Sequence, residues 1–308
     1  MALNRNPRLL ALLEAIGVTF LWSTSYILIE KGLEEINPFA FATYRYGLAS
    51  SILVPMMIYR NRSALRNLDR RDIAVFLALG VFGYFIAQGL QFVGLYYLHP
   101  VTVTLILNLT PVFVLLLSAV FLQEIPSSSQ ILGIAITLGG VLVFFSDSIQ
   151  VIEELTGLLT TLVSSIGWAT YMVISRFYLR DRKETVVVMT ANSMAFGAVL
   201  LLGATILTGN MTRVSIHGWI LIGWLSLVNT ALAFVLWNHA LQSLRVYEQS
   251  ILQNTMLIQI AVLAYVFLNE TLVFREVAGM ALVFIGVLIV QLKGRERAPT
   301  SRNTKRNE

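Results

Sequence analysis

The chain contains no cysteine and few charged residues. The absence of Cys among its 308 residues excludes disulfides, thiolate catalysis and Cys-based metal sites. Asp, Glu, Lys and Arg make up only 13% of the chain, against roughly 25% in soluble domains. With 56% hydrophobic residues and a mean hydropathy of +0.74, the chain has too few polar side chains to cover a water-facing globule. A bilayer is therefore the expected solvent.

Several functional motifs are also missing. There is no GxxxxGK[ST] loop to hold a nucleotide, which argues against ATP-driven chemistry, and neither HExxH nor GxSxG occurs. The formal net charge of +5 could indicate nucleic-acid binding, but the basic residues form short blocks between apolar stretches, a pattern typical of membrane orientation. We expect no cofactor, no metal site, no catalytic residue and no nucleic-acid partner.

Apolar stretches of about 20 residues, each able to cross the hydrocarbon core as a helix, recur along the chain. The first follows Arg5 and Arg8 and could imitate a signal peptide, but no small-residue cleavage site follows it, so we interpret it as a retained span. Proline opens a helix more easily than it continues one, so Asn37-Pro38 and His99-Pro100 are expected boundaries. The sequence predicts ten transmembrane helices, near residues 9–30, 38–59, 73–98, 101–122, 130–146, 156–179, 186–207, 216–242, 248–268 and 277–292.

The distribution of Lys and Arg predicts the orientation. With the N-terminus inside, 18 of the 22 basic residues fall on the cytoplasmic side, where they are normally enriched. Lys31, Arg213 and Arg275 fall outside, and Arg45 lies within a span. We therefore expect a multi-pass protein of the prokaryotic cytoplasmic (inner) membrane with both termini cytoplasmic. Residues 293–308 predict a basic, disordered cytoplasmic tail.

The sequence repeats itself at an offset of 146 positions. Residues 108–142 align without a gap on residues 254–288, with 11 of 35 positions identical. Matching leucines could follow from apolar bias, but Asn108 with Asn254, Glu124 with Glu270 and Gly133 with Gly279 could not. We expect a first five-helix repeat over 1–150 and a second over 151–292. Because five is odd, the two halves must cross the membrane in opposite senses, which makes an inverted repeat.

On these features the chain resembles the EamA family of the drug/metabolite transporter superfamily, over nearly all of residues 9–292. The resemblance rests on the duplicated halves, Arg45, the Glu-x8-Gly pattern, and the segments Leu21-Trp22-Ser23-Thr24-Ser25-Tyr26 and Asn108-Leu109-Thr110-Pro111. Leu257 departs from the pattern at the place of Pro111 in the second half. The resemblance implies efflux or exchange of small metabolites, amino acids or drug-like compounds without ATP hydrolysis.

Polar and aromatic side chains at helical spacing give six expected helices equivalent faces. We interpret them as the walls of one central cavity for a small-molecule substrate, because polar groups at membrane depth usually face protein or water. The competing interpretation is helix–helix packing. Walls of this kind suit a flat or cationic organic solute. The candidate substrate-binding residues are Trp22, Ser25, Gln88, Gln91, Thr104, Asn108, Trp168, Tyr171, Phe234, Trp237, Ser250 and Asn254.

Three further residues are gating or coupling candidates. Arg45 has two interpretations, a gate or anion contact, or a structural or snorkelling arginine, and we favour the structural one; Tyr44 and Tyr46 beside it are typical of an interfacial belt. Glu14 is either a proton-coupling carboxylate or, in the favoured interpretation, a solvated group of the inner vestibule. Pro111 should bend its helix, as a hinge or as a packing feature.

Three functional hypotheses remain. The leading one is a secondary transporter that exports small organic solutes by alternating access. A lipid-modifying intramembrane enzyme would need clustered acids or histidines, and only Glu14 and His239 lie at membrane depth. A sensor or scaffold would bind ligand without flux. Membrane lipids are expected partners, and the chain is expected to be a monomer or a homodimer, since small-xxx-small pairs such as Ser193/Gly197 serve contacts within or between chains.

Overall fold

The computed structural model describes residues 7–61, 65, 68–98, 100–146, 155–180, 186–267 and 272–294. These residues form helices and connecting turns only. Seven helical runs are long and apolar enough to cross a membrane, and α8 is a shorter apolar helix. The predicted all-α membrane fold is confirmed, whereas the count of ten crossings stays a prediction. The expected repeat boundary at 150 and the tail beyond Gly294 lie outside the described residues.

The helices of the first half match the expected segments closely. In chain order they are α1 (Pro7–Leu33), α2 (Pro38–Arg60), α4 (Arg70–Leu79), the π-helical η2 (Gly80–Gly89), α5 (Leu90–Tyr97), α6 (Pro100–Leu107), α7 (Thr110–Phe121) and α8 (Ser128–Phe144). The segments α4, η2 and α5 form one continuous run. The division expected at His99-Pro100 is present, because α5 ends at Tyr97 and α6 begins at Pro100.

The second half repeats this order. Its elements are α9 (Leu155–Leu179), α10 (Val186–Leu207), α11 (Ile216–Ser226), the π-helical η5 (Leu227–Leu232), α12 (Ala233–Ala240), α13 (Val246–Gln253), α14 (Thr255–Phe267) and α15 (Phe274–Gly294). The segments α11, η5 and α12 again form one run. A π-helical segment thus occupies the third run of each half, at positions that correspond under the 146-residue offset.

Local sequence signals set several helix starts. The Asn37 side chain accepts a hydrogen bond from Phe39 N, and Pro38 occupies the first turn of α2. Ser127 and Gln130 form a capping box at the start of α8, with the Gln130 side chain reaching back to Ser127 N. These caps satisfy backbone donors that would otherwise be left unpaired at the helix ends.

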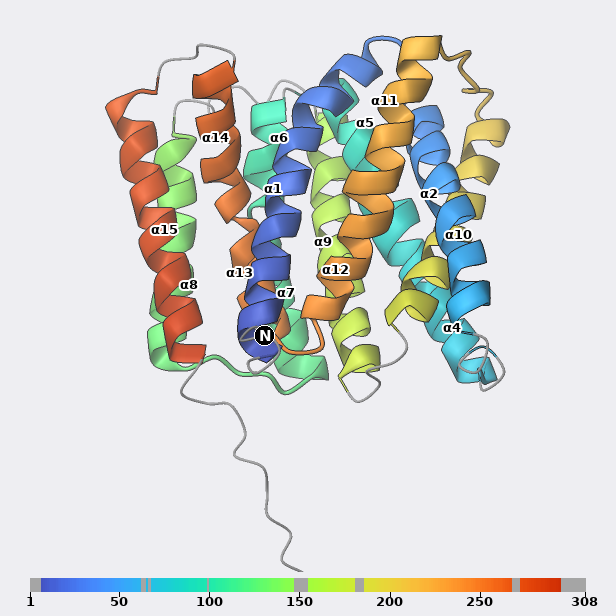
Figure 1. The fold of residues 1–308 in the computed structure, drawn as a ribbon. Helices are drawn as coiled ribbons and strands as arrows, with labels where there is room; N and C mark the ends of the chain where they lie inside the picture. The colour runs from blue at the N-terminus through green and yellow to red at the C-terminus, as the bar shows by residue number, and fades with distance from the viewer. Residues whose placement is uncertain are drawn as a thin grey trace, which may run out of the picture.

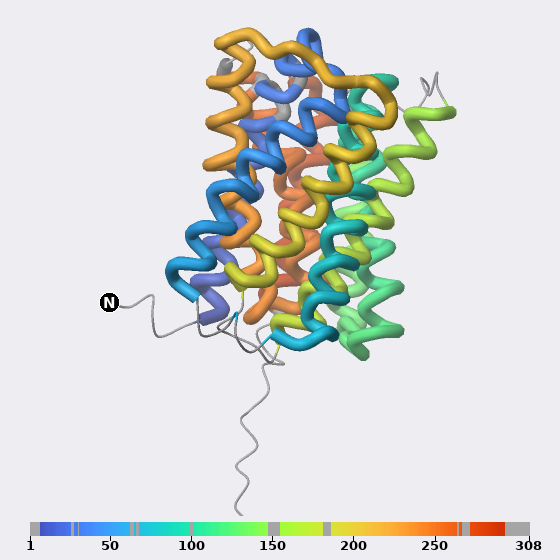
Figure 2. Tube along the Cα trace, turned by 90° about the vertical axis from the view of Figure 1, so that its right-hand side faces the viewer, coloured from blue at the N-terminus to red at the C-terminus, as the bar shows by residue number. Residues whose placement is uncertain are grey.

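The two halves run in opposite senses. In Figure 1, α1 rises from the lower edge of the bundle, whereas its counterpart α9 descends from the upper edge. The start of α1 and the end of α15 lie at the same lower edge, which we call the terminal end. Figure 2 shows α10, in yellow, between α2 and the run that starts with α4. Ser193 and Gly197 of α10 face Gly80 in this contact, so this small-residue pair serves packing within the chain.

Two equivalent helical runs are interrupted in the middle. They are α6 with α7, the fourth run along the chain, and α13 with α14, the ninth. The helical hydrogen-bond pattern stops at Asn108 and Leu109 between α6 and α7, and at Asn254 between α13 and α14. Pro111 lies in the first turn of α7, just after the first break. The second half breaks at the equivalent place although Leu257 replaces the proline. The break therefore does not depend on proline alone.

The outer pair of helices, α8 and α15, packs backbone against backbone. A Cβ added to Gly140 would lie 2.8 Å from the carbonyl oxygen of Gly279, and one added to Gly279 would lie 2.8 Å from that of Gly140. Gly133 and Gly286 face each other in the same way. Only glycine permits this approach, and such small-residue contacts are typical of membrane helices.

The partner of Glu124 in the repeat, Glu270, lies outside the described residues.

The outward faces of the helices carry large apolar side chains. Phe20, Trp224 and Phe284 are each half exposed or more. An exposed apolar surface of this extent is costly in water and favourable against lipid tails. The polar residues lie inside instead. This inside-out distribution agrees with a multi-pass membrane protein.

Candidate functional site

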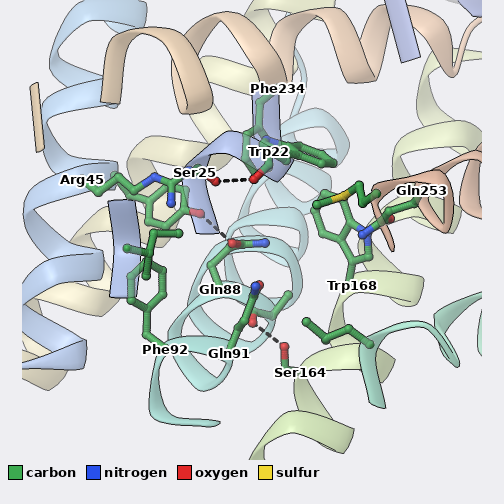
Figure 3. Close-up of a pocket in the computed structure, with 15 residues that line it drawn as sticks. Trp22, Ser25, Arg45, Gln88, Gln91, Phe92, Ser164, Trp168, Phe234 and Gln253 are labelled. Atoms are coloured by element: carbon green, nitrogen blue, oxygen red, sulfur yellow. Dashed lines mark hydrogen bonds between the residues drawn. The ribbon is translucent and has the colours of Figure 1, made fainter. Parts of the chain in front are cut away.

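A cavity opens in the middle of the bundle, between the two halves (Figure 3). It is partly open to solvent, and the gaps between its lining side chains together with the solvent at its opening amount to about 580 Å³. Helices of both halves contribute to its walls. The lining residues are Trp22, Ser25, Ile29, Arg45, Tyr46, Ala87, Gln88, Gln91, Phe92, Leu107, Ser164, Trp168, Phe234, Gln253 and Met256.

Three aromatic rings form one wall of the cavity. Trp22 of α1 lies edge-on to Trp168 of α9 and to Phe234 of α12, with ring centroids 5.8 and 5.7 Å apart. The Trp168 and Phe234 centroids are also 5.8 Å apart. These edge-to-face distances lie in the favoured range for aromatic pairs. The three helices thus present a mutually packed aromatic surface to the cavity.

The indole N–H groups of this wall are held by neighbouring polar groups. Trp22 Nε1 donates to the backbone carbonyl of Asn229 in η5 at 3.1 Å. Trp168 Nε1 donates to Gln253 Oε1 of α13 at 2.8 Å, and Figure 3 shows the two side chains meeting. Each bond fixes a ring across a helix–helix contact. Both N–H groups of this wall are therefore already bonded within the protein.

Arg45 is a charged side chain of the lining. It comes from α2 and is 3% exposed. Its Nε donates to Thr230 Oγ1 at 2.7 Å, its Nη2 donates to Asn229 O at 3.3 Å, and its guanidinium lies 5.7 Å from the Tyr46 ring centroid. Arg45 is therefore held inside the protein and does not snorkel to the surface. It both ties α2 to η5 and borders the cavity.

Amide side chains supply further polar surface, beside the hydroxyl groups of Ser25, Ser164 and Tyr46. Tyr46 OH donates to Gln88 Oε1 at 2.7 Å, and Gln91 and Gln253 lie at the same cavity. The expectation that Tyr46 belongs to an interfacial belt is wrong, because Tyr46 is fully buried. Tyr44 does pack at an outer position, with its ring centroid 5.3 Å from that of Trp219.

Of the twelve expected substrate-binding residues, six line this cavity: Trp22, Ser25, Gln88, Gln91, Trp168 and Phe234. Tyr171 and Trp237 form a layer behind them. Tyr171 stacks on Trp168 with centroids 5.0 Å apart, and Trp237 packs on Trp22 at 4.9 Å. Both rings are fully buried. They support the wall and do not border the space.

The other four expected residues make helix contacts. Asn108 Nδ2 donates to Thr104 O in the preceding turn, and Ser250 Oγ donates to Tyr247 O. Asn254 Nδ2 donates to Asn108 O at 3.3 Å. None of the four belongs to the lining of this cavity, which matches the packing interpretation for them. Their functional roles stay predictions.

Sequence reasoning missed several lining residues. Leu107, Gln253 and Met256 sit beside the expected Asn108, Asn254 and Leu257. Two of them, Leu107 and Gln253, are separated by 146 positions and so correspond in the repeat. The expected helix faces were placed on Asn108 in the first half and on Asn254 in the second. Faces placed one residue earlier in the sequence, on Leu107 and Gln253, would have included them.

Charged contacts join the two halves at the terminal end. Arg8 Nη1 lies 3.0 Å from Glu248 Oε2, and Arg176 Nε lies 2.9 Å from Glu124 Oε1. Glu124 also accepts from Val246 N at 3.0 Å, so it caps the start of α13 in the other half. Each pair joins a residue before 150 to one after 150. We call these two pairs the terminal bridges.

A third contact between the halves joins Glu14 and His239, the acid and the histidine that the sequence predicts at membrane depth. His239 Nδ1 of α12 lies 2.7 Å from Glu14 Oε2 of α1. Glu14 is 14% exposed and His239 45%, and the role of Glu14 stays a prediction. Among the described residues, no group of three or more His, Cys, Asp or Glu could hold a metal ion. His99 lies outside the described residues.

Comparisons with known proteins agree on one family. A profile of the EamA-like transporter family matches residues 9–146 and 155–292. An uncharacterized transporter of Bacillus subtilis, YyaM, is 26% identical over 280 residues, covering 89% of this chain and 90% of that protein. An uncharacterized transporter of Archaeoglobus fulgidus is 26% identical over 284 residues, covering 91% and 97%.

Two further matches are more distant. A chlamydial S-adenosylmethionine/S-adenosylhomocysteine transporter, from Chlamydia trachomatis, is 28% identical over 193 residues, covering 59% of this chain and 58% of that protein. A crystal structure of another protein superposes with a TM-score of 0.77 at 21% identity, covering 93% of this chain and 98% of that one. The structural likeness shows a shared fold.

Proposed function

Because the chain belongs to the EamA-like transporter family and is a membrane transporter of small solutes, we propose that it is a secondary exporter of small organic solutes that works by alternating access. The substrate binds in the central cavity between the two halves. Both termini face the cytoplasm, and the membrane is the prokaryotic cytoplasmic membrane. No step requires a cofactor.

The composition of the cavity is the observation that carries this proposal. Trp22, Trp168 and Phe234 offer aromatic surface, while Gln88 and Gln91 offer amide donors and acceptors. Small-molecule sites in proteins typically combine an apolar lining with a few placed polar groups. The absence of an acidic side chain from the described lining argues against an inorganic cation as the substrate.

The position of the cavity supports alternating access. Its walls come from both inverted halves, and inverted repeats commonly move against each other around a site at their interface. The terminal bridges join the halves at one end. We propose that these bridges close the cytoplasmic end in this conformation and separate when the cavity opens inward.

Glu14 and His239 are our candidates for coupling. They join α1 of the first half to α12 of the second, the same two helices that carry Trp22 and Phe234. A change of charge in this pair would therefore act on the contact between the halves. Pro111, next to the break between α6 and α7, remains the hinge candidate.

The experiment that tests the function begins with binding. Purified protein is screened by thermal unfolding against amino acids, nucleobases, polyamines, quaternary ammonium compounds and S-adenosylmethionine. A ligand at 100 times its Kd should stabilise the protein by about 2.7 kcal/mol. We expect Trp168→Ala to abolish the shift, whereas Trp224→Ala, which removes a lipid-facing tryptophan, should retain it.

Counterflow in proteoliposomes then separates the hypotheses. Saturable flux of the bound ligand supports the transporter. Tight binding without flux would favour the sensor or scaffold, and turnover of lipid would favour the intramembrane enzyme. Flux that persists unchanged in Trp168→Ala would contradict this cavity as the binding site.

A further inference from the structure

We propose that the central cavity selects organic solutes with exposed carbonyl oxygens, which accept hydrogen bonds from the side-chain NH2 groups of Gln88 and Gln253. The two residues come from different halves of the chain, Gln88 from η2 and Gln253 from α13. This inference rests on the proposed function, since it names the substrate class of the same cavity. It adds a hydrogen-bonding pattern to the expectation of a flat solute.

The orientation of the Gln253 amide is fixed by Trp168. An indole N–H can only donate a hydrogen bond, and Trp168 Nε1 donates to Gln253 Oε1 at 2.8 Å. The oxygen of this amide is therefore held against the indole. Because oxygen and nitrogen occupy opposite branches of the planar amide, the NH2 group points away from Trp168.

A phenol holds the Gln88 amide in a corresponding way. Tyr46 OH donates to Gln88 Oε1 at 2.7 Å, which turns the NH2 group away from the tyrosine. Figure 3 shows the Gln88 side chain in the middle of the lining residues, between Arg45 and Trp168 in this view. Gln88 also lies in the π-helical η2, and wide turns of this kind are frequent at functional sites.

Both NH2 groups are left for a solute. Within the described part of the chain neither has a hydrogen-bond partner, although both side chains border the cavity. An apolar solute at this place would leave the two donors unpaired, which costs free energy, whereas a carbonyl oxygen would bind them. Sites built in this way reject analogues that lack the matching polar group.

Two hydroxyl groups of the lining do not fill this role. Ser25 Oγ donates to Trp22 O at 2.7 Å, and Ser164 Oγ donates to Ala87 O at 2.6 Å. A hydroxyl group has a single proton, so both serines meet a solute as acceptors. The amides thus supply donors that these hydroxyl groups do not.

The competing interpretation uses the amide oxygens. A carbonyl oxygen has two lone pairs, so Gln88 Oε1 and Gln253 Oε1 could each accept a second bond, from a donor on the solute. Such a cavity would favour solutes with N–H groups over solutes with carbonyl groups. The two interpretations therefore predict opposite preferences.

The test uses four uncharged bicyclic probes of similar shape. N-methylphthalimide has two carbonyl groups and no N–H, 1-indanone has one carbonyl group, indane has no polar group, and indole has an N–H donor. Affinities for the detergent-purified wild-type protein are measured by calorimetry, with a titration into protein-free detergent subtracted.

We expect the affinity to fall in the order imide, ketone, indane. The imide should bind at least about tenfold more tightly than indane, a difference of about 1.4 kcal/mol, and indole should bind no more tightly than indane. Equal affinities across the set, tighter binding of indole than of the ketone, or no binding of any probe would overturn the proposal.

Variants then assign the preference to the two amides. Gln88→Met and Gln253→Met should each lower the imide-to-indane affinity ratio about threefold, half of the wild-type free-energy difference. Gln259→Met is the matched control, because Gln259 lies further along the same run, outside the lining, and bonds to Ser23 and Thr19. An unchanged ratio in folded Gln88→Met and Gln253→Met would contradict the assignment. The wild-type comparison stands even if a variant does not fold.

Two further variants test the orientation of the amides. Trp168→Phe keeps an aromatic ring and removes the N–H that holds Gln253 Oε1, and Tyr46→Phe removes the hydroxyl group that holds Gln88 Oε1. An amide released from its donor can turn its oxygen toward the solute. Indole should therefore gain affinity relative to 1-indanone in both variants, whereas a purely structural role would weaken all four probes alike.

Flux measured with the same probes keeps this inference separate from the function. Carbonyl-selective binding without flux in proteoliposomes would overturn the transporter proposal and leave the carbonyl site standing. Flux of the probes with no preference for carbonyl groups would overturn the carbonyl site alone.

Discussion

Asn254 donates a hydrogen bond from its side-chain amide to the backbone carbonyl of Asn108, its own counterpart 146 positions earlier, at 3.3 Å. The two residues mark the breaks of the ninth and fourth runs, where backbone groups lose their helical partners. Equivalent positions of the two halves thus meet near the internal symmetry axis. The contact satisfies a carbonyl exposed by one break with a side chain supplied by the other.

This contact predicts unequal effects for two equivalent asparagines. Asn254→Ala leaves the buried carbonyl of Asn108 without this donor, and an unpaired buried polar group costs about 1–3 kcal/mol. Asn108→Ala keeps that carbonyl and removes only a bond to Thr104 O in its own helix. We expect the larger loss of thermal stability in Asn254→Ala. Equal losses would show that the contact across the axis contributes little.

The glycine contact between α8 and α15 predicts a sharp positional effect. A Cβ at residue 140 would lie 2.7 Å from Val283 N, whereas a Cβ at residue 139 would have no heavy atom within 4 Å. Gly140→Ala should therefore lower the unfolding temperature, because overpacking typically costs about 1–3 kcal/mol. Gly139→Ala, one residue away in the same helix, should leave it unchanged. Similar temperatures for the two variants would argue against the backbone contact.

The terminal bridges predict a change in accessibility. Because the chain has no native cysteine, Leu241→Cys places a unique thiol at a buried site whose carbonyl accepts from Arg176. Adding Glu124→Gln removes the carboxylate that holds Arg176. We expect faster reaction of the thiol with a membrane-impermeant maleimide applied from the cytoplasmic side. Unchanged labelling would contradict a closing role for this bridge.

The Glu14–His239 pair predicts a pH dependence of transport. Histidine is the side chain that normally changes charge between about pH 5 and 8, and this one contacts a carboxylate across the two halves. We expect the flux of the wild-type protein to vary with pH over this range and the flux of Glu14→Gln to vary much less. His217→Gln, at an exposed position outside this pair, should behave like the wild type. A Glu14→Gln variant with undiminished pH dependence would remove this pair from coupling.

The fold was more accessible to sequence reasoning than the site. Runs of apolar residues, proline starts and the 146-residue repeat each depend on local composition, and the helices begin and end close to the expected residues. The breaks at Asn108 and Asn254 were harder to foresee, because Leu257 gives no proline signal in the second half. The pairing of Glu14 with His239 depends on which helices are neighbours, which no local pattern records.

The errors at the site have a geometric cause. Faces drawn at i, i+4 and i+7 assume an unbroken α-helix. In the fourth and ninth runs the helix stops in the middle, and the residues that border the cavity are Leu107 and Gln253, one position before the expected asparagines. Tyr46 was misplaced for another reason: a tyrosine near the end of a span is common at the membrane surface, and only packing shows that this one is inside.

The matching π-helical segments, η2 and η5, keep the two halves in register. The offset between equivalent residues is 146 before the segments, between Trp22 and Trp168, and again after them, between Asn108 and Asn254. Each half therefore passes through its wide helical turn with the same number of residues. A residue deleted from one segment alone would rotate everything after it in that half, and so would move one wall of the cavity out of line with its counterpart.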